Sequence, residues 1–129
     1  MTEKLEIYKC HVCGNLVQVL ISGIGELVCC GQAMEHLIPK CEENNELAEK
    51  HIPVFENKDG KRIVTLTHHP MTDEHYIQLI EVISKDKSAF SVKYLHPNEI
   101  AQFDITELEG EYDAVEHCNI HGLWRSKND

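Results

Sequence analysis

A cysteine and a histidine near the end of the sequence have the spacing of a metal-binding pair. Cys118 and His121 are separated by two residues and followed by Gly122, which can adopt the positive φ that a tight turn often needs. Such a turn can direct a thiolate sulfur and an imidazole nitrogen towards one point. Taken alone, the pair is explained at least as well by a buried cysteine beside a surface histidine. Other parts of the chain supply further potential ligands.

Four cysteines near the start of the chain form a second possible site. Cys10 and Cys13 have two residues between them, whereas Cys29 and Cys30 are adjacent. Adjacent side chains point to opposite sides of an extended segment, so joint ligation by Cys29 and Cys30 requires a sharp turn, which Gly31 permits. A Cys29–Cys30 disulfide is the alternative, but it would be strained and a reducing compartment disfavours it. We predict a four-thiolate metal site that is part of the fold, because pieces shorter than about 40 residues seldom fold by apolar burial alone.

The composition of the 129 residues narrows the class of protein and its partners. An apolar fraction of 42% with 26% charged residues is ordinary for a globular protein. The formal net charge of -10 disfavours nucleic acid and anionic membranes as partners, since both need a basic surface. Residues 1–6 alternate in charge, unlike a signal peptide, and no segment approaches the ~20 apolar residues of a membrane span. We expect a cytoplasmic protein whose six cysteines and nine histidines include metal ligands rather than disulfides.

Short β-strands are expected to position these residues. Runs over 5–8 and 16–21 are strand-like and surround the first cysteine pair. Later runs, apolar or alternating and separated by turn signals, predict strands at 52–55, 62–67, 76–83, 89–95, 100–105 and 112–115. No helical heptad is evident. The pattern predicts an all-β protein in which a small metal-bound domain precedes an antiparallel β-sandwich.

A change of composition marks the predicted domain boundary. Residues 38–45 are polar and charged and contain a proline. We therefore place one domain at residues 1–37 and the other at 38–129. Cys41 lies in this stretch without a partner at ligand spacing, so we expect it to be a bystander.

Three histidines of the larger domain stand at predicted strand ends or in loops: His51, His69 and His75. Each alone is more typical of a surface histidine or a hydrogen-bonded core histidine. Together with Cys118 and His121 they supply four imidazoles and one thiolate. This set has one nitrogen more than a tetrahedral zinc site would use, and it suits iron better than magnesium or calcium.

The motifs together resemble those of the desulfoferrodoxin family, the two-iron class of superoxide reductases, over essentially the whole chain. They are Cys10-x2-Cys13 with Cys29-Cys30, Glu49-Lys50-His51, His69-Pro70-Met71 with His75, and Cys118-Asn119-x-His121-Gly122. Accidental similarity does not account for separated motifs in the right order.

The resemblance implies a fold, two metal centres and an activity. Residues 1–37 would be a desulforedoxin-like domain that binds iron through Cys10, Cys13, Cys29 and Cys30. Residues 38–129 would be an immunoglobulin-like β-sandwich whose square-pyramidal iron has four histidines in the plane (His51, His69, His75 and His121) and Cys118 on the axis. The protein would be a homodimer with two iron ions per chain and no haem, flavin or nicotinamide. It would reduce superoxide by one electron to hydrogen peroxide and receive electrons from rubredoxin or a similar donor.

Glu49 and Lys50 are the predicted catalytic residues. Lys50 adds a positive charge beside His51 that would attract superoxide, and it can order a water that delivers a proton. In an extended segment Glu49 shares a face with His51, so it could cap ferric iron after product leaves, as its counterpart in the family does. Lys50 would then point away unless the loop bends. The alternative for both residues is a solvated charged loop.

The sequence departs from the family pattern in places and leaves two other functions open. His68 precedes His69, and alignment on His-Pro-Met selects His69 as the ligand. His117 stands where an aromatic residue is expected, and three further histidines match no motif and are expected at the surface: His11, His36 and His96.

The chain could instead be a structural module with zinc at both sites, or an iron electron carrier that does not turn over superoxide.

Overall fold

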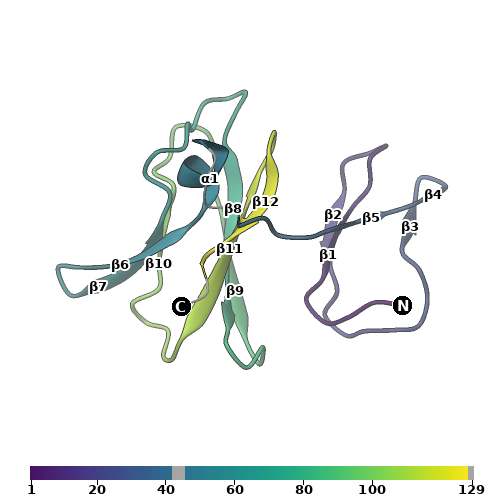
Figure 1. Ribbon diagram of the computed structural model, residues 1–129, viewed down its shortest axis with the longest axis horizontal. Coiled ribbons are helices and arrows are strands. Elements are labelled where there is room, and N and C mark those ends of the chain that lie inside the picture. The colour runs from purple at the N-terminus through teal and green to yellow at the C-terminus, as the bar shows by residue number, and fades with distance from the viewer. Residues whose placement is uncertain (42–45, 128–129) are drawn as a thin grey trace. The chain divides into compact units, whose positions relative to one another are not determined.

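The computed structural model of the chain describes residues 1–41 and 46–127, apart from the side chains of residues 46, 47 and 49. The chain divides into two compact units, Met1–Ile38 and Pro39–Asp129 (Figure 1).

The smaller unit consists of two small antiparallel sheets. In one, β1 (Ile7–Lys9) pairs with β2 (Leu16–Gln18) and β5 (Glu35–Leu37), and the other contains β3 (Val28–Cys29) and β4 (Gln32–Ala33). The strand predicted at 16–21 is therefore correct only in its first half. Among the described residues of this unit, Ile7 and Cys10 are the buried apolar ones. Apolar burial is too small here to hold the unit by itself.

The larger unit is an immunoglobulin-like antiparallel β-sandwich of two sheets, which confirms the all-β prediction. The first sheet has the order β10-β7-β6, with bounds Gln102–Asp104, Lys61–Thr65 and Val54–Lys58. The second has the order β12-β11-β8-β9, with bounds Gly122–Arg125, Tyr112–Cys118, Ile77–Ser84 and Phe90–Tyr94 (Figure 1). All strand pairs in both sheets are antiparallel.

Apolar side chains from both sheets form the core of the sandwich. Val64 of β7, Ile80 and Val82 of β8 and Ala114 of β11 are fully buried in one cluster. Burial of a side chain of valine or isoleucine size stabilises the fold by roughly 1.5–3 kcal/mol. Cys118, at the end of β11, belongs to the same cluster, so the core itself positions this sulfur.

Two elements of the larger unit differ from the sequence predictions. A short helix, α1 (Glu46–His51), contains Lys50 and ends at His51, so the expected extended segment with Glu49 and His51 on one face is wrong. Six residues seldom form a stable helix alone. Here Ala48 of the helix and Ile52 after it pack against Trp124. Trp124 lies on β12, the second unpredicted element, which forms a hairpin with β11.

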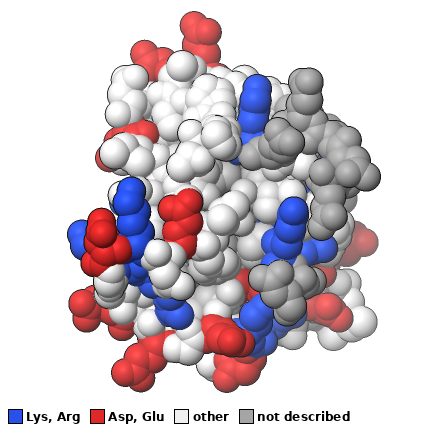
Figure 2. Space-filling model, turned by 60° about the vertical axis from the view of Figure 1, so that its left-hand side comes forward, with Lys and Arg blue, Asp and Glu red and all other residues white. Residues whose placement is uncertain are grey.

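The surface of the molecule carries charges of both signs. Figure 2 shows Asp and Glu side chains interspersed with Lys and Arg on the face in view. Within the described part of the chain, no helix has the length and apolar character needed to cross a membrane.

Candidate metal centres

The four cysteines of the smaller unit converge on one point. The Sγ atoms of Cys10, Cys13, Cys29 and Cys30 all lie within 4.8 Å of one another. Cys30 (φ +54°) and Gly31 (φ +73°) both adopt left-handed backbone conformations. This turn between β3 and β4 brings the sulfurs of the two adjacent cysteines to 3.9 Å, on one side of the chain. The sharp turn expected at Gly31 is thus present, and it includes Cys30.

The sulfur separations fit a tetrahedral metal ion. Cys13 Sγ lies 3.6 Å from Cys29 Sγ, and Cys29 Sγ lies 3.9 Å from Cys30 Sγ. Metal–sulfur bonds of about 2.3 Å in a tetrahedron require sulfur–sulfur distances of about 3.8 Å. The four thiols therefore fit a four-coordinate ion with little rearrangement.

The four thiols differ in their pKa values. The backbone N–H of Cys13 donates to Cys10 Sγ at 3.5 Å and, as the largest cause, lowers the pKa of Cys10 to about 6. Hydrogen bonding to Cys13 and then to Cys29 raises the pKa of Cys30 to about 12. One thiolate is therefore available at neutral pH, and a bound cation would displace the remaining protons.

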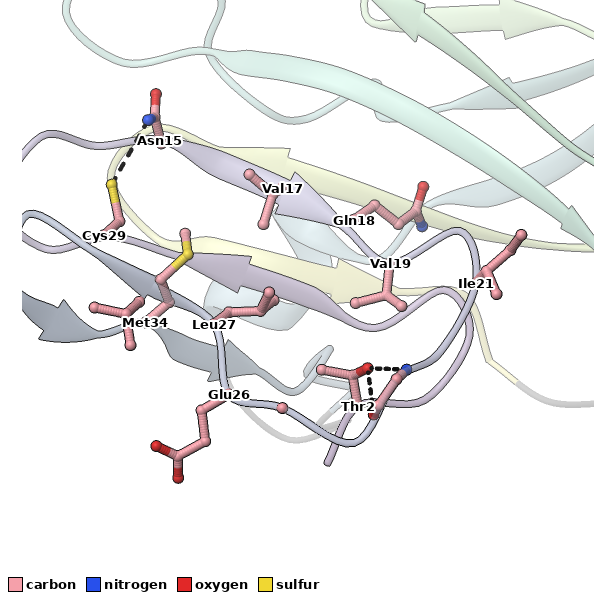
Figure 3. A pocket seen from close by; sticks show the side chains of 13 residues that line it. Thr2, Asn15, Val17, Gln18, Val19, Ile21, Glu26, Leu27, Cys29 and Met34 are labelled. Atoms are coloured by element: carbon pink, nitrogen blue, oxygen red, sulfur yellow. Dashed lines mark hydrogen bonds between the residues drawn. The ribbon is translucent and has the colours of Figure 1, made fainter.

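An apolar pocket of about 590 Å³ lies beside Cys29 (Figure 3). Its lining includes Val17, Leu27 and Met34. Asn15 Nδ2 donates to Cys29 Sγ at 3.8 Å at the edge of this pocket (Figure 3). Asn15 therefore adds one hydrogen bond to the thiol group from outside the ligand set.

Four segments of the larger unit bring imidazoles and a thiol together. His51 ends α1, His69 follows β7, His75 precedes β8 and Cys118 ends β11. One ligand atom from each of these four residues lies within 4.8 Å of the others. The ring of His121 adjoins this group, with its centroid 4.9 Å from that of His51 and 5.0 Å from that of His75. We call these five residues the His/Cys group.

The ring nitrogens of the His/Cys group include two without a hydrogen-bond partner. His69 Nδ1 donates to the Pro70 carbonyl at 2.5 Å, so its Nε2 is an acceptor and pairs with His51 Nε2 at 3.0 Å. Within the described part of the chain, His75 Nε2 and His121 Nδ1 are buried without a hydrogen-bond partner. An unsatisfied buried polar atom costs about 1–3 kcal/mol. A metal ion that accepts the lone pairs of these two nitrogens would remove that cost, so the donor set fits a metal.

Burial keeps the imidazoles of His69 and His75 neutral, which is the state that binds a metal. Burial is the largest cause that lowers the pKa of His69 to about 4, and positive charge on the neighbouring imidazoles acts in the same direction. The pKa of His75 is also lowered, first by burial and then by the charges of His121 and Lys50. These histidines are therefore neutral at pH 7 without help from a metal.

Cys118 needs a cation to become a thiolate. Burial raises the pKa of this thiol, while the backbone N–H groups of His121 and Ile120 lower it. The His121 N–H donates to Cys118 Sγ at 3.4 Å. Because a coordinated cation stabilises the thiolate, metal binding here would release a proton.

Two residues that the sequence analysis gave no role support the His/Cys group. The side chain of Asn119 accepts a hydrogen bond from Tyr76 N at 2.9 Å and donates to the Glu74 carbonyl at 3.0 Å, which ties the turn after Cys118 to the segment around His75. The indole of Trp124 stacks on His51, with centroids 5.0 Å apart. Asn119 is part of the motif that contains Cys118 and His121, whereas nothing in the sequence indicated that Trp124 contacts His51.

The remaining predicted residues have varied surroundings. Lys50 is exposed, and the side chain of Glu49 lies outside the described residues. His68 is exposed, whereas its neighbour His69 is buried in the His/Cys group. His117 Nδ1 lies 2.7 Å from Gln78 Oε1.

The other histidines and the sixth cysteine lie outside both groups. Three histidines at the surface pair with acidic side chains: His11 with Glu35, His36 with Glu6 and His96 with Glu99. Cys41 is partly buried against the cluster of Ala48, Ile52 and Trp124. Among the described residues, none of these side chains belongs to either group of potential ligands.

Comparisons with known proteins cover nearly the whole chain. Two family models match: the desulfoferrodoxin N-terminal domain at residues 2–37 and desulfoferrodoxin at residues 43–127. A desulfoferrodoxin of Desulfarculus baarsii is 44% identical over 132 residues, which cover 99% of this chain and 100% of that protein. A superoxide reductase of Thermococcus kodakarensis is 30% identical over 98 residues, which cover 61% of this chain and 85% of that protein. The crystal structure of the superoxide reductase from Treponema pallidum has the same fold, with a TM-score of 0.71 at 23% identity over 98% of this chain and 100% of that chain.

Proposed function

Because the chain belongs to the desulfoferrodoxin family, we propose that it is a superoxide reductase. In this reaction superoxide takes up one electron and two protons and leaves as hydrogen peroxide. The observation that carries the proposal is the His/Cys group, in which four imidazoles and one thiol come together and two ring nitrogens, His75 Nε2 and His121 Nδ1, are buried without a partner among the described residues. The similarity to the superoxide reductase of Thermococcus kodakarensis supports it.

We propose iron as the metal of both centres. At the His/Cys group, ferrous iron would supply the electron and, with five protein ligands, one open coordination position for a small oxidant. His51, His69, His75 and His121 would hold it by neutral imidazole nitrogens, and Cys118 by its thiolate. The core position of Cys118 and the buried imidazoles would exclude water from the protein side of the centre.

Lys50 is proposed to attract the substrate. Its ammonium is exposed, and its charge lowers the pKa of His75, so its field reaches this side of the His/Cys group. Superoxide is an anion approaching a protein of net charge -10, so a local positive charge at the site is needed to favour its approach. Lys50 could also order a water that supplies one of the two protons the reaction requires.

Glu49, the electron donor and the assembly are assigned by family resemblance. Glu49 would approach the open position after product leaves. Rubredoxin or a similar protein would resupply electrons, and the chain would act as a homodimer. The four-thiolate centre would relay electrons or hold the smaller unit together. A cytoplasmic location suits the six free thiols of the structure.

Pulse radiolysis of the reduced protein tests the proposal. We expect superoxide to oxidise the His/Cys iron rapidly, and Lys50→Ala to slow this step by about tenfold at low salt, within the range of electrostatic steering. Lys85→Ala is the matched control, because Lys85 pairs with Asp113 and follows β8, whose opposite end pairs with Cys118. The rate in this control should equal that of the native protein.

Two results would exclude the proposal. A colourless purified protein would indicate zinc, since a ferric thiolate absorbs visible light. A coloured protein that superoxide does not oxidise would be an electron carrier. Equal rates for native protein and Lys50→Ala would remove Lys50 from the mechanism and leave the activity in place.

A further inference from the structure

Two side chains outside the ligand set donate hydrogen bonds to the backbone of His121. Lys40 Nζ donates to the His121 carbonyl oxygen at 2.8 Å, and Trp124 Nε1 donates to the same oxygen at 3.1 Å. A carbonyl oxygen has two lone pairs, so both bonds can form together. The peptide group of this proposed ligand is therefore held from outside the centre.

Trp124 connects the lysine to a second imidazole. The indole stacks on His51 with an interplanar angle of 24°, and both residues are buried. On the same indole, Lys40 Nζ lies 5.1 Å from the ring centroid, which is cation–π geometry. Lys40 and Trp124 thus act together on two residues of the His/Cys group, His51 and His121.

The backbone of Lys40 is hydrogen-bonded to β12, which restricts where the Lys40 ammonium can lie. Lys40 N donates to the Leu123 carbonyl at 3.0 Å, and Arg125 N donates to the Lys40 carbonyl at 2.9 Å. These bonds form an isolated parallel bridge between Lys40 and Trp124. Most surface lysines lose side-chain entropy to hold one contact. Here the backbone of Lys40 is already ordered against β12, the strand on which Trp124 lies.

The ammonium of Lys40 lies close to two of the proposed ligands. Its Nζ is 2.8 Å from the backbone oxygen of His121 and 5.1 Å from the centroid of the indole that stacks on His51. By Coulomb's law, a positive charge this near the centre favours the metal state of lower charge.

We propose that Lys40, together with Trp124, is a positioning residue of the His/Cys centre. It holds the His121 peptide and the His51–Trp124 stack, and its charge favours the reduced metal over the oxidised one. This inference rests on the proposed function only in taking iron as the metal.

Redox titration of the iron-loaded protein tests the inference. Lys40→Met removes the ammonium but keeps an unbranched chain, and Lys40→Arg keeps the charge, the donors and the cation–π contact. Lys85→Met is the control, because it changes the net charge equally at the Ser84 end of β8, roughly 20 Å along the strand from the end that pairs with Cys118. The midpoint potential of the His/Cys iron is read from its visible absorption, and iron content is measured on the same samples.

The expected result is a lower midpoint potential in Lys40→Met only. A shift of the equilibrium towards the oxidised state by about tenfold corresponds to about 59 mV for one electron. Lys40→Arg should keep the native potential, as should Lys85→Met. If Lys40→Met fails to retain iron, Lys40→Arg must restore both iron content and potential. Equal potentials for Lys40→Met and Lys85→Met, or failure of the arginine variant to restore the native state, would overturn the inference.

The titration uses no superoxide, so the two proposals fail separately. A native protein that titrates reversibly but does not react with superoxide would refute the reductase and leave the role of Lys40 standing. Rapid oxidation by superoxide with no effect of Lys40→Met on the potential would refute the role of Lys40 alone.

Discussion

We predict that acid destabilises the metal-free larger unit, and that His69 contributes to this loss of stability through its lowered pKa. Burial lowers the pKa of His69 to about 4, from 6.5 for the ordinary side chain. Between these values the unfolded chain binds a proton that the folded chain does not bind. Stability is therefore greatest above pH 6.5 and is lost as the pH falls towards 4.

The size of the effect follows from the two pKa values. One pKa unit corresponds to 1.36 kcal/mol, so His69 alone contributes a loss of about 3 kcal/mol between pH 7 and pH 4. This is a large part of the 5–15 kcal/mol by which domains are typically stable. Bound metal should remove the effect above the pH at which the ion is released, because the imidazole lone pair is then occupied.

Urea unfolding of the metal-free protein at a series of pH values measures this contribution. Trp124 is the single tryptophan of the chain and is buried in the larger unit, so its fluorescence reports on that unit. In His69→Gln the fall in stability between pH 7 and pH 4 should be smaller by about 3 kcal/mol than in the native chain. The control is His96→Gln, because His96 is exposed and pairs with Glu99.

Only the difference between His69→Gln and the native chain is informative, since carboxylates also titrate in this range. If both lose the same free energy between pH 7 and pH 4, the imidazole of His69 is not held neutral by burial. The reasoning about the state of the metal-free site would then be wrong.

Three further predictions concern the two units separately. Cys13→Ser should reduce iron content from two ions to one per chain by metal analysis and leave the Trp124 unfolding transition unchanged, because Cys13 is in the smaller unit; a shifted transition would contradict separate cores. Ile80→Ala should destabilise the larger unit by about 2–5 kcal/mol in urea, as expected for a fully buried isoleucine, and a loss below 1 kcal/mol would mean that the core collapses around the cavity. Trp124→Phe keeps the stack on His51 but removes the hydrogen-bond donor to the His121 carbonyl, so we expect this variant to lose iron to a ferrous chelator faster than the native protein. The control is Tyr94→Phe, because Tyr94 is exposed.

Much of the architecture was predictable because it is encoded locally. Alternating and apolar runs predicted most strands of the sandwich, and Asp59 and Gly60, both with positive φ, form the turn expected between two of them. The cysteine motifs are equally local: a two-residue spacing and a following glycine restrict where the sulfurs can point. The pairing of β1 with β5 and the hairpin of β3 with β4 could not be predicted, because strands of two or three residues have no readable period.

The side chains available to the metals can be read from the residue order, since thiol and imidazole chemistry is a property of each residue and the motifs keep the donors in short turns. The support of the His/Cys group depends instead on how the chain folds in three dimensions. The tertiary structure made residues 46–51 a helix packed on Trp124, and it placed Lys40 against the His121 carbonyl, 81 positions away in sequence. Such contacts depend on which strands pair and in what register, and no local pattern of residues specifies that pairing.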